Sequence, residues 1–258
     1  MNFLAIIGRV FLGFLQLTGR IAQFTGVAVL HCVRPPYYPR LIGRQMLDIG
    51  YFSLPVVGMT ALFTGMVLAL QSYTGFARFS AEGAVATVVV LSMTRELGPV
   101  IAGLMVAGRI GASMAAEIGT MRVTEQIDAL STLSTNPFKY LVAPRLIAGL
   151  TMLPLLVVVA DVIGVFGGYL IGIYKLGFNP AAYLKRTFDY LEAIDVISGL
   201  TKAGAFGFLI SLMGCYHGYH SDGGAQGVGR ATTNAVVSAS ILILVFNYGI
   251  TEIFFATK

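Results

Sequence analysis

Three ionisable residues interrupt long apolar stretches of the chain and are the first candidates for chemistry. Arg95 and Glu96 lie near the middle of residues 83–108, and Asp161 lies within residues 146–174. A charged side chain in hydrocarbon is costly unless it is paired or faces water. Such residues therefore either hold a charged ligand group or form ion pairs that fix helix packing. Because adjacent residues of a helix point to different faces, we expect Arg95 and Glu96 to have different partners.

Asp161 and a further ionisable residue of the apolar stretches, Lys202, have simpler interpretations. Gly164, Gly167 and Gly168 follow Asp161 and indicate close helix packing. We therefore expect Asp161 to be a packed, hydrogen-bonded carboxylate, with a proton relay as the alternative. Lys202 lies near the start of its apolar stretch, and we expect it to reach the membrane interface with its long side chain.

A polar, helix-compatible segment at residues 117–130 stands between long apolar runs. It carries charges of both signs, and it belongs to the longest inner loop, residues 109–145. The segment supplies apolar anchors of the kind that a helix lays into a groove of a partner: Ile118, Met121, Ile127 and Leu130. We expect a docking element on a membrane-embedded chain; a solvated surface helix is the alternative.

Metal binding and nucleotide hydrolysis are both disfavoured by the sequence. Cys215, His217 and His220 stand close together, and His31 adjoins Cys32, but structural zinc sites have four ligands at paired spacings. We expect histidines at the membrane edge and no metal site. The chain contains no G-x-x-x-x-G-K-[ST] sequence. It therefore cannot hydrolyse ATP itself, and any energy must come from a partner.

The elements that position these residues are transmembrane helices. Hydrophobic residues make up 56% of the chain and charged residues only 11%, against about 25% charged in soluble proteins. A bilayer core of ~30 Å needs about 20 apolar residues per crossing. We predict an all-α integral membrane protein with one domain, residues 1–258. Its five approximate spans are residues 49–77, 83–108, 146–174, 196–216 and 231–255. Gly98 and Pro99 predict a break in the second span.

Residues 1–30 have the pattern of an amphipathic helix in the membrane interface. Polar residues recur at helical spacing, and Arg9 and Arg20 interrupt the apolar run. A sixth crossing helix is the alternative, but it would bring both arginines into hydrocarbon. The proline-rich residues 34–40 end this helix before the first span.

The distribution of Lys and Arg predicts the orientation, because cytoplasmic loops retain positive charge. With the N-terminus inside, the inner segments hold ten such residues and the outer segments five. The inner ones are Arg9, Arg20, Arg34, Arg40, Arg44, Arg109, Arg122, Lys139, Arg145 and Arg230. The outer ones are Arg78, Lys175, Lys185, Arg186 and Lys258. We therefore expect a cytoplasmic N-terminus and a periplasmic C-terminus.

Several short motifs occur in a characteristic order along the chain. They are Arg95-Glu96-Leu97-Gly98-Pro99, Ala107-Gly108-Arg109, Glu117-Ile118-Gly119-Thr120-Met121, Glu125-Gln126-Ile127-Asp128-Ala129-Leu130 and Gly227-Val228-Gly229-Arg230-Ala231-Thr232-Thr233. Together they resemble the MlaE family of permeases, which belong to ABC systems working with MCE-domain lipid-binding proteins. The resemblance covers nearly the whole chain, although the first 40 residues match only in character.

The resemblance implies a homodimeric permease of the bacterial inner membrane that exchanges phospholipid with a periplasmic MCE protein and contributes to outer-membrane lipid asymmetry. Two cytoplasmic ABC ATPase subunits would bind ATP and Mg²⁺, so this chain would hold no cofactor and have no catalytic residue. A small STAS-type accessory subunit is a further expected partner. We expect no nucleic-acid partner.

The resemblance also implies roles for particular residues. Arg95, Glu96 and Leu97 would border the lipid cavity near the dimer interface. By position alone, Leu68, Phe76 and Phe79 would contact acyl chains. The residues expected to couple to the ATPase are Glu117, Gly119, Met121, Arg122, Glu125, Gln126, Asp128 and Leu130.

Two other classes of function compete with this interpretation. An ion-coupled secondary transporter could use Arg95, Glu96 and Asp161 to carry protons or ions, but the chain has no internal repeat of the kind such carriers often have. A scaffold that only anchors partners would not need charges within a span.

Overall fold

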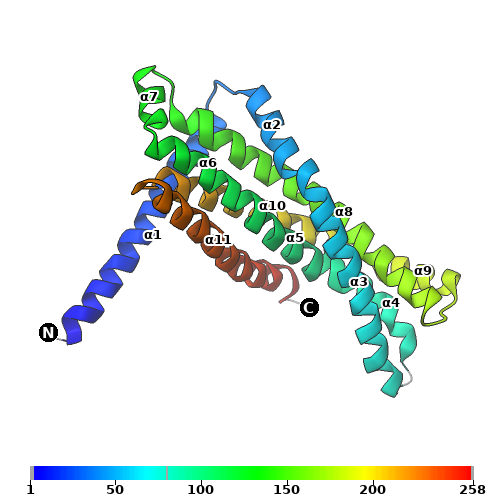
Figure 1. Cartoon of the computed structure of the whole chain (residues 1–258). Helices are drawn as coiled ribbons and strands as arrows, with labels where there is room; N and C mark the ends of the chain where they lie inside the picture. Colours follow the sequence, from blue (N-terminus) through cyan, green and yellow to red (C-terminus); the bar gives the residue numbers. More distant parts are fainter. Residues whose placement is uncertain (1–2, 80, 257–258) are drawn as a thin grey trace.

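The computed structural model describes residues 3–79 and 81–256, without the side chains of residues 3–7, 9, 10, 14 and 82. All the regular secondary structure in this part of the chain is helical (Figure 1). The α-helices are α1 (Phe3–Val33), α2 (Pro39–Ile49), α3 (Leu54–Phe76), α4 (Val85–Ser92), α5 (Gly98–Val106), α6 (Ala112–Val123), α7 (Gln126–Thr132), α8 (Ala143–Tyr174), α9 (Pro180–Asp189), α10 (Ala193–Tyr219) and α11 (Gly224–Phe255). Three π-helical turns, η4 (Met93–Leu97), η5 (Ala107–Gly111) and η6 (Phe138–Val142), and three short 3₁₀ turns, η1 (Tyr51–Ser53), η2 (Ala77–Phe79) and η3 (Glu82–Ala84), join them.

Five helical runs among the described residues are long and apolar enough to cross a membrane. They are Pro39–Phe79, Val85–Val123, Phe138–Tyr174, Ala193–Tyr219 and Gly224–Phe255. The predicted all-α membrane class is confirmed, and so is the number of spans. Several runs are longer than the apolar stretches on which the prediction rested. In particular, the second continues through α6, so much of the expected inner loop is a helical extension of a span.

The centre of the bundle is formed by α8 and α10. α3 packs along α8, while α10 packs against α8, α6 and α11. Glycines allow these close approaches: a Cβ atom at Gly65 of α3 would overlap the carbonyl group of Gly164 in α8, and one at Gly207 of α10 would overlap that of Gly149. Small residues that let backbones touch are the usual basis of helix association in membranes.

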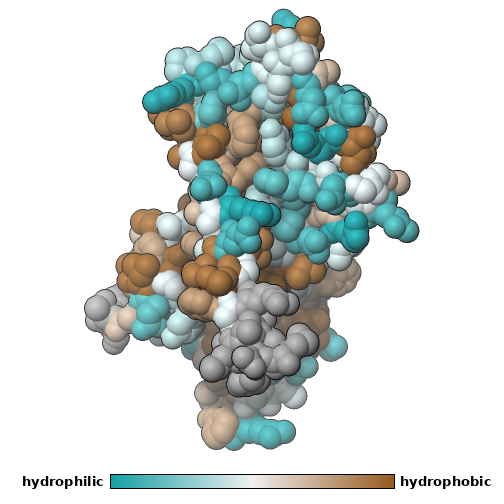
Figure 2. All heavy atoms as spheres, turned by 90° about the vertical axis from the view of Figure 1, so that its left-hand side faces the viewer, coloured by the Kyte–Doolittle hydropathy of each residue, from teal (hydrophilic) through white to brown (hydrophobic). Residues whose placement is uncertain are grey.

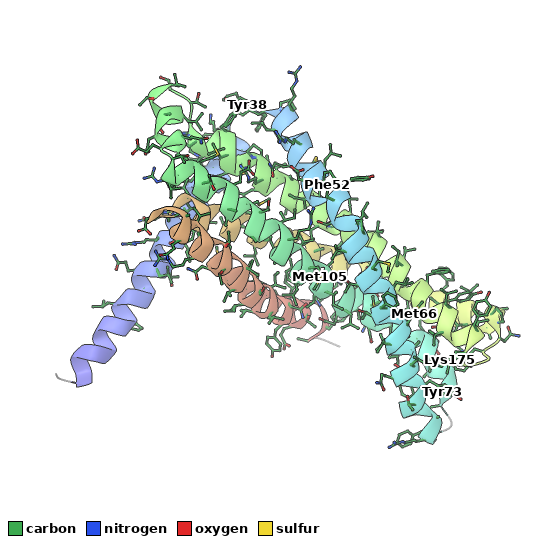
Figure 3. All side chains as sticks on the ribbon, viewed as in Figure 1. Tyr38, Phe52, Met66, Tyr73, Met105 and Lys175 are labelled. Atoms are coloured by element: carbon green, nitrogen blue, oxygen red, sulfur yellow. The ribbon has the colours of Figure 1, made fainter. Side chains whose placement is uncertain are left out.

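The bundle has two distinct ends. α7 and the beginning of α2 lie at one end, and α9 lies with the α3–α4 connection at the other (Figure 1). Tyr38 marks the first end, whereas Tyr73 and Lys175 mark the second (Figure 3). Hydrophilic residues spread over the upper part of one face, at the end that carries α7 (Figure 2). The polar segment and the apolar spans are therefore separated along the long axis of the molecule.

The C-terminal part of α1 is docked on the bundle, and its N-terminal part projects away from it (Figure 1). Phe24 and Ala28 are buried, and the Phe24 ring centroid lies 5.1 Å from that of Phe138 and 5.4 Å from that of Tyr216. α1 is not among the five candidate spans. Its location in the membrane interface stays a prediction, and Asn2 and the side chain of Arg9 lie outside the described residues.

Gly65→Ala should destabilise the α3–α8 contact, because the new methyl group would overlap the Gly164 carbonyl. Overpacking of this kind costs about 1–3 kcal/mol. Gly75→Ala on the same helix is the matched control, since its Cβ would meet nothing within 4 Å. The melting temperature of the detergent-solubilised protein should fall for Gly65→Ala relative to Gly75→Ala. Equal melting temperatures would contradict close packing at Gly65.

Candidate functional site

A π-helical turn stands where the sequence predicts a break in the second span. Met93–Leu97 forms the turn η4, and α5 follows from Gly98, so the helix does not break. Pro99 has no N–H to donate to the Arg95 carbonyl four residues earlier. The Lys202 ammonium group donates to this carbonyl oxygen instead, at 2.8 Å. π turns inside helices are frequent at functional sites.

Glu96 is the centre of a partly buried polar network. Its Oε1 atom lies 2.7 Å from Lys202 Nζ and accepts a hydrogen bond from the Thr251 hydroxyl at 3.0 Å. Its Oε2 atom accepts from the Asn247 amide at 2.8 Å. These partners come from α10 and α11, so one carboxylate joins three helical runs.

Arg95 forms a second ion pair beside the first. Its Nε atom lies 2.7 Å from Oδ1 of Asp195, whose side chain is fully buried. Oδ2 of Asp195 accepts from the backbone N–H of Glu192, which closes a capping box at the start of α10. The Arg95 guanidinium also lies over the Phe255 ring, 4.6 Å from its centroid. The prediction that Arg95 and Glu96 have different partners is confirmed.

The network is electrically neutral and lies towards one end of the bundle. Two cations, Arg95 and Lys202, face two anions, Glu96 and Asp195. Asp195 is in the first turn of α10, and Thr251 is in the last turns of α11, at the end of the bundle that carries α9. Pairing in this geometry removes most of the cost of placing charges in an apolar bundle.

Four members of the network were not found from the sequence: Asp195, Lys202, Asn247 and Thr251. Lys202 does not reach the interface as expected, because its side chain is 0% exposed and paired with Glu96. Each contact joins residues at least 100 positions apart, so helical spacing could not reveal it. The available signal was charge balance, since an isolated Lys in one span complements an isolated Glu in another.

The apolar residues expected at the lipid cavity are divided between the core and the surface. Leu97 and Leu68 are partly buried against the core, as is Phe76, whereas Phe79 in η2 is 79% exposed. None of the cavities described in this single chain is lined by these residues or by Arg95 or Glu96.

Asp161 differs from the hydrogen-bonded carboxylate that we expected. Its Oδ1 atom is buried without a hydrogen-bond partner among the described residues. The atom packs against Gly98, where a Cβ atom would overlap it. The expectation of close helix packing is correct, and the expectation of a hydrogen bond is wrong, because the neighbouring surface is a glycine and not a donor.

The polar segment at residues 117–130 forms two helices and not one. α6 ends at Val123, Glu125 adopts a left-handed conformation with φ of 59°, and α7 begins at Gln126. Arg122 Nη1 lies 2.8 Å from Asp128 Oδ1 and ties the two helices together. The turn between them exposes its polar side chains at the end of the molecule.

Two of the apolar anchors expected for a partner are used within the chain itself. Ile118 and Ile127 are buried, and Met121 and Leu130 are partly buried against the core. Gly119 is also buried, facing Ser221. They are not available to a partner because they hold α6 and α7 on the bundle. The exposed members of the expected coupling set are Glu117, Glu125, Gln126 and Asp128, with Arg122 half-buried.

A buried arginine, Arg145 of α8, holds α6 in place through Glu117. The Arg145 side chain is 4% exposed, and its Nη2 atom lies 2.8 Å from Glu117 Oε2. Its Nη1 atom donates to the Leu141 carbonyl at 2.6 Å. Nearby, Arg109 in the turn η5 donates to the Asp48 carbonyl at 2.5 Å. These bonds connect α6 to α8 and the second span to α2.

The histidines that the sequence places near cysteines make ordinary side-chain contacts. His217 Nε2 lies 3.0 Å from Ser238 Oγ, and His31 Nε2 lies 3.1 Å from the Asn136 amide nitrogen. Within the part of the chain that the structure describes, no group of three or more His, Cys, Asp or Glu residues is placed to hold a metal ion.

A bundle of five apolar runs, a neutral ionic network inside it and a polar helical turn at one end define a polytopic membrane protein. The family model of Permease MlaE matches residues 42–253, and the chain belongs to this family of ABC transporter permeases.

Curated relatives agree with the family assignment. A probable ABC transporter permease protein of Rickettsia felis is 64% identical over 99% of this chain and 98% of its own. A probable ABC transporter permease protein of Synechocystis is 39% identical over 90% of this chain and 88% of its own. The intermembrane phospholipid transport system permease protein MlaE of Haemophilus influenzae is 33% identical over 99% of this chain and 98% of its own.

Glu96→Ala should destabilise the bundle, because it leaves the Lys202 ammonium group buried without a counter-charge. Breaking a buried pair in this way costs about 3–5 kcal/mol. Adding Lys202→Met should recover most of the loss, since the unpaired charge is then removed. Thermal unfolding of both single variants and the double variant tests this, and additive losses would contradict the pairing.

Proposed function

We propose that this chain is the membrane subunit of an ABC transporter that moves phospholipid between the inner membrane and a periplasmic MCE lipid-binding protein, and so contributes to outer-membrane lipid asymmetry. The observation that carries the proposal is the neutral ionic network inside a bundle whose last helix exposes an apolar face. The name of the Haemophilus influenzae relative, an intermembrane phospholipid transport system permease protein, supports the choice of phospholipid.

The lipid cavity is proposed to form between two copies of the chain. On α11, Val237, Ile241, Leu244 and Tyr248 are all exposed and lie on one face, at the spacing of a helix–helix seam. Ala239 and Ile243, on the opposite face, are buried. A second copy would cover the exposed face, and the network is attached to this helix through residues 247 and 251.

In this dimer, Arg95, Glu96 and Leu97 would border the cavity, and Leu68, Phe76 and Phe79 would contact acyl chains. Arg95 and Glu96 are only partly exposed, at 34% and 37%, so they keep a polar edge while paired. Because Arg95 and Glu96 stay paired, their exposed polar atoms can bind a zwitterionic or anionic head group, and neither side chain is left as an unpaired charge in hydrocarbon.

The polar turn between α6 and α7 is the proposed contact for two cytoplasmic ABC ATPase subunits, which bind ATP and Mg²⁺. Glu125, Gln126 and Asp128 are exposed there. The continuous helical run Val85–Val123 carries the network near one end and this turn at the other. At 1.5 Å per residue its 39 residues span about 58 Å, so one stiff element connects the two sites.

The proposed cycle follows from the energetics of the acyl chains. Each buried methylene contributes ~0.8 kcal/mol, so two acyl chains bind strongly in an apolar slot. Closure of the cytoplasmic side on ATP binding would narrow the cavity and expel the lipid.

The N-terminus would be cytoplasmic and the C-terminus periplasmic, with the MCE protein at the end that carries α9 and a STAS-type subunit at the cytoplasmic end.

The alternative is an ion-coupled secondary transporter using Arg95, Glu96 and Asp161. Asp161 favours it, because this carboxylate has no partner among the described residues. Against it, Arg95 and Glu96 are each paired within the chain, so neither is free to carry an ion. Transport driven by a proton gradient without any ATPase would decide for the alternative.

Glu125→Lys should abolish lipid-stimulated ATP hydrolysis while the protein stays in the membrane. Glu125 is exposed, so the substitution reverses a surface charge. Its backbone is left-handed, but Lys and Glu have the same unbranched Cβ, so the change adds no backbone strain. Glu125→Asp is the matched control and should keep ATP hydrolysis. Reconstituted complexes and a phosphate-release assay provide the measurement. Normal lipid transport by a stably expressed Glu125→Lys protein would contradict the coupling role.

Ile241→Cys should form a disulfide-linked dimer on mild oxidation in a background without the native cysteines. Its side chain is exposed on the proposed seam, whereas Ala239 is fully buried in its own chain. Ala239→Cys is therefore the control and should stay monomeric on a non-reducing gel. If neither Ile241→Cys nor Tyr248→Cys cross-links in native membranes, the α11 seam is wrong.

A further inference from the structure

A separate cavity lies between α4, α8, α9 and the start of α10. Its volume is about 540 Å³, which is within the range of small-molecule sites. Neither Arg95, Glu96 nor Leu97 lines it, so it is distinct from the proposed lipid cavity at the dimer seam. We call it the α8–α9 slot.

The walls of the α8–α9 slot are almost wholly apolar. Val162, Val165 and Phe166 come from α8, and Leu184 and Phe188 come from α9. Phe166 is 52% exposed and Phe188 is 71% exposed, so the slot opens on the outer surface of the bundle. The α8 side of the opening belongs to the candidate span Phe138–Tyr174, so a ligand can enter on this side from the bilayer.

Two polar groups in the slot have no hydrogen-bond partner among the described residues. They are Oδ1 of Asp161 and the hydroxyl group of Tyr183, both of them buried atoms. Leaving a buried polar group unpaired costs free energy, so such groups call for a partner. Burial raises the pKa of Tyr183 to about 12, so this phenol keeps its proton.

The two polar groups lie at different levels of the slot. Asp161 is packed against Gly98, and the Tyr183 hydroxyl is close to Gly168. Residues 161 and 168 share one face of α8 and are two turns apart, which corresponds to about 10 Å along the helix. Val165 lies between these two levels. The slot is therefore an apolar channel with an acceptor at one level and a phenol at the other.

We propose that the α8–α9 slot binds an uncharged amphiphile with an aliphatic hydroxyl group, which donates to Asp161 while its apolar body lies along Val165 and Phe166 towards Tyr183. A carboxyl group can accept from a hydroxyl in either protonation state. An ammonium group would satisfy Asp161 too, but bringing a cation into the hydrocarbon region is costly. The uncharged donor fits both the polar group and the apolar entrance.

Photolabelling of the full-length protein in phospholipid nanodiscs tests the proposal. The probes are a photoreactive long-chain primary alcohol and its methyl ether, which has the same apolar body but no donor. The alcohol should label the peptide containing Val165 and Phe166 more strongly than the ether, by roughly two- to tenfold, the effect of one hydrogen bond. Unlabelled alcohol should compete with this labelling in the wild-type protein.

The variants assign the preference to one carboxyl group. Asp161→Leu should remove the preference for the alcohol, whereas Asp161→Asn should keep it, because an amide oxygen still accepts. The control is an apolar groove of about 360 Å³ between α2, α3 and α8, lined by Met46, Leu54 and Met152 among others, which has no ionisable group except the phenol of Tyr51. Alcohol and ether should label this groove equally.

Three results would overturn the proposal. One is equal labelling of the slot by alcohol and ether in the wild-type protein, a measurement that needs no variant to fold. Another is a preference that survives in Asp161→Leu. Labelling that does not compete with unlabelled alcohol would mean that the probe only reports the surrounding bilayer, and this too would contradict a binding site.

Discussion

Four ionised side chains meet inside this bundle, and their mutual pairing constrains much of the architecture. Lys202 has no exposed surface and depends on Glu96, while Asp195 is equally buried and depends on Arg95. Because an unpaired charge in an apolar bundle is costly, η4, α10 and α11 must stay in register. Lys202 also donates to the Arg95 carbonyl, which cannot accept a hydrogen bond from Pro99 four residues later, so the π turn and the ion pairs stabilise each other.

A second set of polar contacts holds the opposite end of the same helical run. Glu117 binds the buried Arg145, and Arg122 binds Asp128 in α7. The run Val85–Val123 therefore has charged attachments in the π turn η4 and in α6, and the π turn η5 lies between them. A stiff element with this arrangement can carry a movement from the α6–α7 turn to the network, which is what a permease driven by a separate ATPase requires. The short π turns are the places where it can adjust.

The sequence predicted the membrane class, the five spans and the separate partners of Arg95 and Glu96, because these follow from hydropathy and helical geometry. It did not predict the partners themselves, since Asp195 and Thr251 come from spans far along the chain. Ile118 and Ile127 were misinterpreted because amphipathic spacing does not distinguish an anchor for a partner from one for the chain's own core. The Asp161 prediction failed because Gly98, a residue without a side chain, occupies the neighbouring position.

The most direct test of the central claim is affinity purification of this chain from its native membrane in mild detergent, with mass spectrometry of the proteins and lipids that accompany it. The account predicts an ABC ATPase, an MCE-domain protein and phospholipid in one complex. A chain that purifies alone and free of lipid, and that moves solute in liposomes under a proton gradient, would contradict it.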